Sequence, residues 1–470
     1  MDVRLRLTDG VAWPVIGLSA ALLTVADAAA QGNAETDRAA VEALYHATNG
    51  PGWIDSTNWL TAAPLGEWFG VTTENGRVTG LSLLGNGLSG PIPPELANLA
   101  TLRELLLWGN ELSGPIPPEL ANLASLQYLA LDRNELSGPI PPELADLANL
   151  QNLLLTLNDL SGPIPPELAN LANLQELRLN RNGLSGPIPP ELANLTNLDL
   201  LHLSGNELSG PIPPELANLA NLEYLYLSDN ELSGPIPPEL ANLANLRDLM
   251  LDGNELHGPI PAWLGNLTNL RILSLSRNAL TGPIPGSLGN LTNLQSLRLY
   301  ANPLTGPLPQ SLTQLSLLRF FWVHFTRACA PVDAAFQAWV GTIQNFRGTT
   351  CGQDPASSFT DATLTPGRTG VRPIHIYELR QLVNTVRATC ELPRFPWTDP
   401  DPTITIGETP IKAVHLTELR TALAQAYGAC SLTPPTYTDP AIVRGRTPIK
   451  AVHWTELRNA GIRALDAAAR

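Results

Sequence analysis

Residues 101–124 read TLRELLLWGNELSGPIPPELANLA, and this 24-residue unit decides the fold of most of the chain. Ten units of this length follow one another without a gap from residue 77 to residue 316. They share the frame LxxLxLxxNxLSGPIPxELxxLxx, in which the leucines, the asparagine and the Gly-Pro-Ile-Pro segment keep their places. Such a fixed period predicts a solenoid in which each unit contacts its neighbours.

The fixed positions of the unit have a structural explanation. Leu105 and Leu107 alternate with variable residues, so we expect a short strand from which both leucines face inward. Stacked units would join these strands into one parallel sheet, about 50 Å long at roughly 4.7–4.9 Å per strand. An asparagine recurs from Asn86 to Asn302, and a buried amide ladder of this kind can satisfy turn backbone groups. The prolines fix φ and remove N–H donors on one edge.

This frame is the signature of leucine-rich repeats. Its Ser-Gly-Pro-Ile-Pro segment resembles the plant-type subclass, which includes ectodomains of plant receptor-like kinases and polygalacturonase-inhibiting proteins. The resemblance covers roughly residues 35–352. It implies an α/β solenoid, a leucine-rich-repeat superhelix with a parallel concave sheet, capped at both ends. No kinase motif follows in this sequence, so the resemblance to the receptors stops at the ectodomain.

Residues 31–76 form the expected N-terminal cap. An amphipathic helix is expected over residues 37–45, and Trp53, Trp59 and Trp68 follow it. Thr72 stands where a cysteine often follows Gly-Val in relatives, and this cap contains no cysteine. We therefore expect aromatic packing alone to hold the cap together.

Residues 317–356 form the expected C-terminal cap, because the frame decays after residue 316. Leu318, Phe321 and Val323 are typical of a last partial coil. Cys329 and Cys351 flank a helix expected over residues 332–346. We predict that these cysteines pair and seal the open end of the solenoid, which otherwise exposes apolar core.

Residues 357–470 contain a second repeat, with three units of about 40 residues that predict a small, mainly α module. Each unit has an aromatic-Thr-Asp segment followed by His-x-x-Glu-Leu-Arg, with a helix expected to start near the histidine. Cys390 and Cys430 lie 15 residues after their histidines, and we predict that they pair. Four cysteines allow three connectivities. Such tails resemble C-terminal modules of secreted bacterial proteins, and together with the missing cap cysteines they favour a bacterial source.

The recurring histidine and glutamate of the tail have two interpretations. At i, i+3 both side chains share a helix face, an arrangement that metal sites also use. We favour a capping box, with histidine at the N-cap and glutamate at N3, or simple packing, because no further ligand recurs with the pair. The sequence has no nucleophile elbow, P-loop or HExxH motif, so we expect no enzyme, cofactor or metal. The pairs are His375/Glu378, His415/Glu418 and His453/Glu456.

Residues 1–30 have the pattern of a secretory signal peptide. Arg4 and Arg6 precede an apolar stretch over residues 11–26, and small residues follow. An uncleaved N-terminal anchor is the alternative. Both interpretations predict a secreted, extracellular or cell-envelope protein, where cysteines can pair. No apolar run after residue 30 approaches the roughly 20 residues of a membrane span.

The chain is acidic, with 43 Asp and Glu against 28 Lys and Arg and a net charge of −15. Phosphate binding needs clustered Lys and Arg, so nucleic acid is excluded as a partner. Within residues 77–316 there are 22 acidic and 9 basic residues, many of them frame glutamates such as Glu95 and Glu111. We place these glutamates off the sheet, on a solvated surface, in preference to a cation-binding face.

The positions that flank the inward leucines vary while the frame stays nearly constant, and this contrast indicates a binding face. Tryptophan, tyrosine and arginine, the residues enriched in interface hot spots, gather there in three patches. Unselected variation after repeat duplication is the alternative. Patch 1 is Leu106, Trp108 and Tyr128; patch 2 is Arg178, Arg181, His202, Tyr224 and Tyr226; patch 3 is Arg298, Tyr300 and Trp322.

Together these features predict a monomeric, non-enzymatic protein that binds a protein ligand through its concave sheet. The alternative is that a glycan or cell-wall polymer binds the same face, where aromatic rings would stack on sugars and polar residues would hydrogen-bond them.

Overall fold

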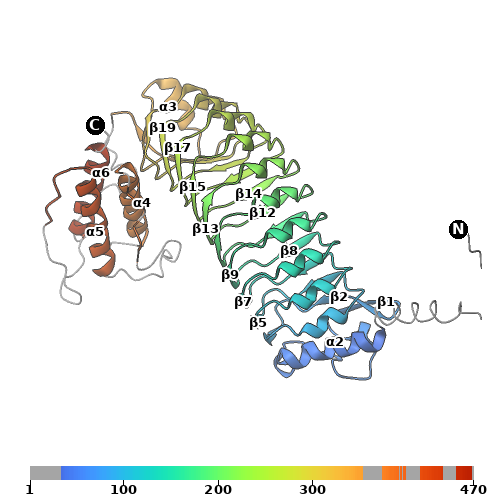
Figure 1. The fold of residues 1–470 in the computed structure, drawn as a ribbon. Coiled ribbons are helices and arrows are strands. Elements are labelled where there is room, and N and C mark those ends of the chain that lie inside the picture. The colour runs from blue at the N-terminus through green and yellow to red at the C-terminus, as the bar shows by residue number, and fades with distance from the viewer. Residues whose placement is uncertain are drawn as a thin grey trace, which may run out of the picture.

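The computed structural model describes residues 33–352, 373–390, 392–393, 395–397, 413–437 and 451–467. The expected signal segment, residues 1–30, lies outside the described residues. Figure 1 shows a long stack of repeating coils with a small group of helices beside its C-terminal end. Among the described residues, no helix is both long and apolar enough to cross a membrane.

The predicted sheet is present and contains thirteen strands, of which each repeat contributes one. β1 (Val71–Glu74) pairs antiparallel with β2 (Arg77–Ser82), and every later pair is parallel and in register. We call this the first sheet; its exposed face is the predicted concave face. Its other strands are β4 (Glu104–Leu106), β6 (Tyr128–Ala130), β8 (Asn152–Leu154), β10 (Glu176–Arg178), β12 (Leu200–His202), β14 (Tyr224–Tyr226), β16 (Asp248–Met250), β18 (Ile272–Ser274), β20 (Ser296–Arg298), β22 (Phe320–Trp322) and β24 (Asn345–Arg347).

A second sheet of twelve strands, not predicted from the sequence, lines another side of the stack. Its short parallel strands begin at the Glu-Leu-Ser-Gly segment, so glutamates such as Glu111 lie on this sheet. The glutamates of the Pro-Glu-Leu segment, such as Glu95, lie in short helices, so both kinds of frame glutamate lie off the first sheet as predicted. The strands are β3 (Ser89–Gly90), β5 (Glu111–Gly114), β7 (Glu135–Gly138), β9 (Asp159–Gly162), β11 (Gly183–Gly186), β13 (Glu207–Pro211), β15 (Glu231–Gly234), β17 (Glu255–Pro259), β19 (Ala279–Pro283), β21 (Leu304–Pro307), β23 (Arg327–Ala330) and β25 (Thr349–Thr350).

Short 3₁₀ helices complete each coil and carry the Pro-Glu-Leu segment. Proline suits the first turn of a helix, where its missing N–H has no intrahelical acceptor. After η1 (Gly50–Gly52) and η2 (Leu65–Glu67) they are η3 (Pro94–Asn98), η4 (Pro118–Asn122), η5 (Pro142–Asp146), η6 (Pro166–Asn170), η7 (Pro190–Asn194), η8 (Pro214–Asn218), η9 (Pro238–Asn242), η10 (Ala262–Asn266), η11 (Gly286–Asn290) and η12 (Gln310–Gln314).

The leucines and asparagines of the frame fill the core as predicted. Leu105 and Leu107 have no exposed surface. Asn110 Nδ2 donates to the carbonyl oxygens of Leu83 and Leu107 at 2.9 and 2.8 Å. Its Oδ1 accepts from the backbone N–H groups of Asn86 and Leu88 at 2.9 and 3.0 Å. One amide therefore joins two successive coils, and the pattern recurs along the stack.

The N-terminal cap contains more than aromatic packing. α2 (Ala34–Ala47) spans the expected helix, and Trp59 contacts the rings of Trp53 and Trp68 at centroid distances of 4.7 and 5.1 Å. Asp37, which is fully buried, accepts hydrogen bonds from Arg77 Nε at 2.9 Å and from the Val78 N–H at 2.8 Å. The expectation of aromatic packing alone is therefore wrong, because this ion pair ties the helix to the first coil.

The C-terminal cap has the predicted disulfide and a shorter helix than predicted. Cys329 and Cys351 are bonded. α3 (Ala334–Val340) ends early because the chain turns at Gly341 and adds β24 to the first sheet. Phe346 on β24 packs against Phe321 with ring centroids 5.5 Å apart, so the solenoid continues one coil beyond the predicted last one.

The C-terminal module has three helices, α4 (Pro373–Thr389), α5 (Ala413–Ala429) and α6 (Ala451–Ala467), around a shared apolar core. The predicted disulfide Cys390–Cys430 joins α4 to α5. Each helix starts two residues before the histidine of its unit, so the histidine is inside the helix and the capping-box interpretation is wrong.

The glutamate of the His-x-x-Glu pair joins successive units of the module. Arg380 Nη2 lies 3.3 Å from Glu418 Oε2, and Arg420 pairs with Glu456 at 3.9 Å. Arg380 and Arg420 also lie over the rings of Trp397 and Tyr437, at 4.7 and 4.1 Å from the ring centroids. The recurring aromatic, glutamate and arginine thus hold one unit against the next. No group of three or more metal-ligating side chains occurs among the described residues.

Candidate ligand-binding face

The first sheet presents three columns of side chains on its exposed face. The middle residue of each strand points into the core, while the first and third residues point outward. The first residues of the strands form the first column, and the third residues form the centre column. Parallel pairing in register aligns the centre column across four successive strands at Arg178, His202, Tyr226 and Met250. A third column lies two residues further along each coil and includes Trp108.

Patch 2 and the neighbouring Asp248 form a connected polar and aromatic cluster across β10, β12, β14 and β16. Arg178 forms an ion pair with Glu176 on its own strand. His202 meets Tyr226 edge to face at a centroid distance of 4.9 Å, and Tyr224 lies 6.2 Å from Tyr226. The strands hold these groups side by side before any ligand binds, and preorganisation of this kind reduces the entropy cost of binding.

Burial sets the charge of this cluster. Burial is the main cause that lowers the pKa of His202 to about 4, and the positive charges of Arg178 and Arg181 add to it. His202 is therefore neutral at physiological pH and offers one donor and one acceptor. Burial also raises the pKa of Asp248, against the hydrogen bond from Tyr226 and the charges of Arg271 and Arg247.

Patch 1 is apolar and exposed at the N-terminal part of the same face. Trp108 is 40% exposed and Tyr128 is 39% exposed, which is unusual for large apolar side chains. Leu106 is half-buried on β4, and Leu84 of the preceding coil is 46% exposed. These side chains offer a surface that a partner's apolar groups can cover.

Patch 3 is partly covered by the C-terminal module. Tyr300 is only 9% exposed and, with Ala301 and Phe325, belongs to one buried cluster with the module helices. It also stacks on His324 at a centroid distance of 4.8 Å. Arg298 lies 5.1 Å from the ring centroid of Trp322, which is half-buried against the same cluster. Tyr300 therefore has a packing role, and we leave patch 3 out of the candidate face.

Most residues of the first column, at the first position of the first-sheet strands, were not among the predicted site residues. Asp248 accepts a hydrogen bond from Tyr226, Glu176 pairs with Arg178, and Asn152 Nδ2 donates to Glu176 at 2.7 Å. The signal was available, because the residue two places before the centre column varies between units as strongly as the centre column does. Only Tyr128 and Tyr224 were selected from it.

Comparison with known proteins agrees with this architecture. Models of the leucine rich repeat match residues 101–123, 125–147, 173–195, 197–219 and 221–243, and a further model of the leucine rich repeat matches residues 244–304. The repeats are leucine-rich repeats. Together with the parallel sheets, they make the chain a leucine-rich-repeat α/β solenoid with a few helices at its C-terminus.

Solved leucine-rich-repeat ectodomains of plant receptors are similar to this chain. A TDR receptor is 31% identical with a TM-score of 0.56, and the match covers 57% of this chain and 47% of that one. The Arabidopsis receptor kinase HAESA, solved with the peptide hormone IDA and a co-receptor, is 30% identical with a TM-score of 0.56. The match covers 63% of this chain and 54% of that one. The chain thus spans about half the length of these receptor structures.

A shorter protein with this fold is matched over nearly its whole length. A plant ice-binding protein is 29% identical with a TM-score of 0.53, and the match covers 62% of this chain and 95% of that one. The same repeat architecture therefore occurs in proteins whose ligands differ, so the fold alone does not choose a ligand.

Proposed function

We propose that this chain is a secreted or envelope-associated, non-enzymatic binding protein that recognises a protein or peptide ligand on the exposed face of the first sheet. The observation that carries the proposal is patch 2 together with Asp248, since His202, Tyr226 and Asp248 lie on successive strands in fixed orientation. The similar receptor kinase HAESA, which was solved with a bound peptide hormone, supports a peptide or protein as the ligand class.

The accessible part of the face limits the size of the ligand. Patches 1 and 2 and their first-column neighbours extend from β4 to β16, whereas the C-terminal module covers part of the face beyond β20. Seven strands at about 4.8 Å spacing span about 29 Å, and an extended peptide advances about 3.4 Å per residue. An extended segment of about eight or nine residues would fill this face, with apolar residues near Trp108 and hydrogen-bonding groups near Tyr226.

A glycan or cell-wall polymer is the second candidate for the same face. The exposed rings of Trp108 and Tyr128 could stack on sugars. Beside them runs a polar row in which the Thr156 N–H donates to Asp132 at 2.8 Å and the Thr156 hydroxyl donates to Asn180 at 2.8 Å. Hydroxyl and amide groups in such a row suit sugar hydroxyls.

Capture by the purified full chain tests the two candidates. Envelope and extracellular proteins would be passed over the immobilised chain and identified by mass spectrometry, and a panel of cell-wall polysaccharides would be tested in parallel. We expect a captured protein or peptide that is lost with Tyr226→Ala and with Trp108→Ala. The protein-ligand proposal fails if both variants leave protein capture unchanged but abolish polysaccharide retention.

A further inference from the structure

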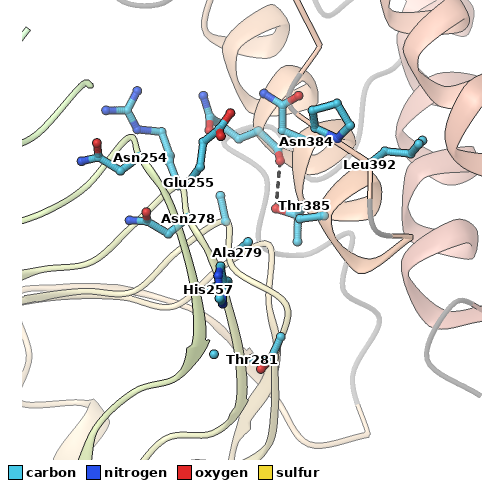
Figure 2. Close-up of a pocket in the computed structure, with 15 residues that line it drawn as sticks. Asn254, Glu255, His257, Asn278, Ala279, Thr281, Asn384, Thr385 and Leu392 are labelled. Carbon is cyan, nitrogen blue, oxygen red and sulfur yellow. Dashed lines mark hydrogen bonds between the residues drawn. The ribbon is translucent and has the colours of Figure 1, made fainter. Parts of the chain in front are cut away.

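A cleft of about 470 Å³ lies between the second sheet and helix α4, and none of the residues of patches 1 and 2 lines it. Figure 2 shows Glu255 and His257 from β17 and Ala279 and Thr281 from β19 on one side, opposite residues of the C-terminal module. Its volume is within the range of ligand-binding sites, which occur preferentially at domain interfaces. Other lining residues are Asn254, Asn278, Ala301, Asn384, Leu392 and Pro393.

The repeat frame changes where the second sheet faces α4. The third strand position of the second sheet is serine in seven successive units, from Ser89 to Ser233, and becomes histidine at His257. The first position is glutamate at Glu231 and Glu255 but alanine at Ala279. α4 contacts β19, so the smaller side chain makes room for the helix. The histidine does not occur at this position in the seven preceding units, whereas a small residue at the first position also occurs at Gly183.

The helix side of the cleft is one stripe of α4. Gln381, Asn384, Thr385 and Ala388 are spaced i, i+3, i+4 and i+7, which places them on one helix face. Gln381, Asn384 and Thr385 are all buried, and the Thr385 hydroxyl donates to the Gln381 carbonyl at 2.9 Å. The cleft is therefore walled by packed elements on both sides.

The lining of the cleft combines apolar side chains, which we call its apolar floor, with the carboxylate of Glu255. Ala279, Ala301 and Leu392 contribute apolar surface, which suits methylene groups. The Glu255 side chain is exposed at the rim. Asp229 and Asp252 both form ion pairs with Arg277, which lines the cleft. The distance from Arg277 Nη2 to Asp252 Oδ2 is 3.3 Å.

Charge selects the ligand class. The Arg277 guanidinium, which lines the cleft, is already paired with two carboxylates, those of Asp229 and Asp252. Glu255 adds a third carboxylate at the rim. On the helix side Arg387 points to other partners, since its Nη1 donates to Gln425 at 2.6 Å and its Nε to the Pro393 carbonyl. The Arg277 guanidinium already shows that this wall stabilises a buried cation. The excess negative charge would repel an anionic ligand and attract a cationic one.

We propose that this cleft binds an alkylammonium group, carried by a free amine or by a lysine side chain, with its methylene stem on the apolar floor and its charge at Glu255. This site shares no residue with patches 1 and 2, so each site can be tested without the other. Lysine side chains and aliphatic diamines share this chemistry, and the two sources differ in whether a peptide backbone accompanies the amine.

Titration calorimetry of the full chain tests the proposal with three probes: cadaverine, N-acetyl-lysine methylamide and, as an uncharged match in shape, N-acetyl-norleucine methylamide. We expect saturable binding of at least one amine and at least tenfold weaker binding of norleucine. Preference for cadaverine identifies a free amine, and preference for the lysine probe identifies a lysine side chain. Absence of saturable binding by both amines, or equal binding of norleucine, overturns the proposal.

Two variants locate the site. Glu255→Gln should weaken amine binding at least tenfold, whereas Glu207→Gln, the same frame position two units earlier and away from α4, should leave it unchanged. Equal loss in both variants would show non-specific attraction to an acidic surface and would overturn the proposal. Both glutamates are exposed, so equal thermal unfolding midpoints will confirm that neither variant disturbs the fold. Ala388→Leu should block the cleft and also abolish binding.

Discussion

The Tyr226 hydroxyl donates a 2.9 Å hydrogen bond to Asp248 Oδ2 across the neighbouring strands β14 and β16. Both side chains are half-buried on the exposed face of the first sheet. Burial raises the pKa of Asp248, and the hydrogen bond from Tyr226 acts in the opposite direction by stabilising the carboxylate. The pair therefore holds a carboxylate and a phenol in fixed geometry at the C-terminal end of the proposed ligand face.

Removing this hydrogen bond should weaken ligand binding with little effect on folding. Tyr226→Phe keeps the ring against His202 but frees the Asp248 carboxylate, and we expect affinity to fall about fivefold to tenfold, or about 1–1.4 kcal/mol. The measurement is the dissociation constant of the protein or peptide captured by the native chain. Ser113→Ala on β5 of the second sheet is the matched control; an equal loss there would contradict a role for the Tyr226–Asp248 pair.

Protonation of His202 should not change the affinity for the ligand between about pH 8 and pH 5. Its pKa of about 4 keeps the imidazole neutral over this range, because it is buried and lies near Arg178 and Arg181. The dissociation constant of the captured ligand would be compared at pH 7.5 and pH 5.5, in the native chain and in His202→Gln. A loss of affinity at pH 5.5 that is present in the native chain and absent from His202→Gln would show that this histidine does become charged.

The 24-residue period was sufficient to predict the first sheet, because fixed leucines such as Leu105 and Leu107 define the inward face of a strand. The second sheet could not be predicted in this way. Its strands pair over only two or three residues at Ser-Gly, and the adjacent prolines argue against a ladder. Gly114 has a φ of 79°, which is outside the strand region, and the segment around it has no alternation of apolar and polar residues.

The candidate face was predicted in part. Most residues of patches 1 and 2 lie on strands of the first sheet, since the columns follow directly from the repeat, whereas Trp108 and Arg181 lie in the coil after a strand. The burial of Tyr300 depends on how a module more than 70 residues further along the chain docks, and no local pattern encodes that contact. Asp248 was not predicted, because nothing in the sequence distinguishes it from the other acidic residues until its hydrogen bond with Tyr226 is known.

The asparagine ladder predicts a large effect from one amide. Asn110→Ala would leave the buried N–H groups of Asn86 and Leu88 and the carbonyls of Leu83 and Leu107 without this partner. Unsatisfied buried groups cost about 1–3 kcal/mol each, so we expect the free energy of unfolding to fall by at least about 3 kcal/mol. Urea unfolding followed by circular dichroism measures this.

Asn149→Ala is the matched control for the ladder. Its Nδ2 also donates across coils, to the Ala124 carbonyl at 2.8 Å, but at an exposed position where water can replace it. We expect a cost of about 1 kcal/mol or less. Similar losses in the two variants would show that the Asn110 amide does not depend on burial for its effect.

Thermal stability should fall on acidification because of His324. Burial is the main cause that lowers its pKa to about 3, with the charge of Arg347 adding to it, whereas the unfolded chain has the ordinary value of 6.5. Between these values the unfolded chain binds a proton that the folded chain does not, so stability declines as pH falls from about 6.5. His324→Phe should flatten the decline of the unfolding midpoint between pH 7 and pH 5. A parallel decline in both proteins would contradict this assignment.

The N-terminal cap allows a test of its ion pair against its aromatic cluster. Asp37→Ala would leave the Arg77 guanidinium without its carboxylate, and breaking a buried pair costs about 3–5 kcal/mol. Replacing both partners, with Asp37→Leu and Arg77→Met, should cost much less, because no buried charge then remains uncompensated. Urea unfolding of the single and double variants gives both values. If the single variant is as stable as the native chain, Tyr45, Trp53, Trp59 and Trp68 hold the cap without the ion pair.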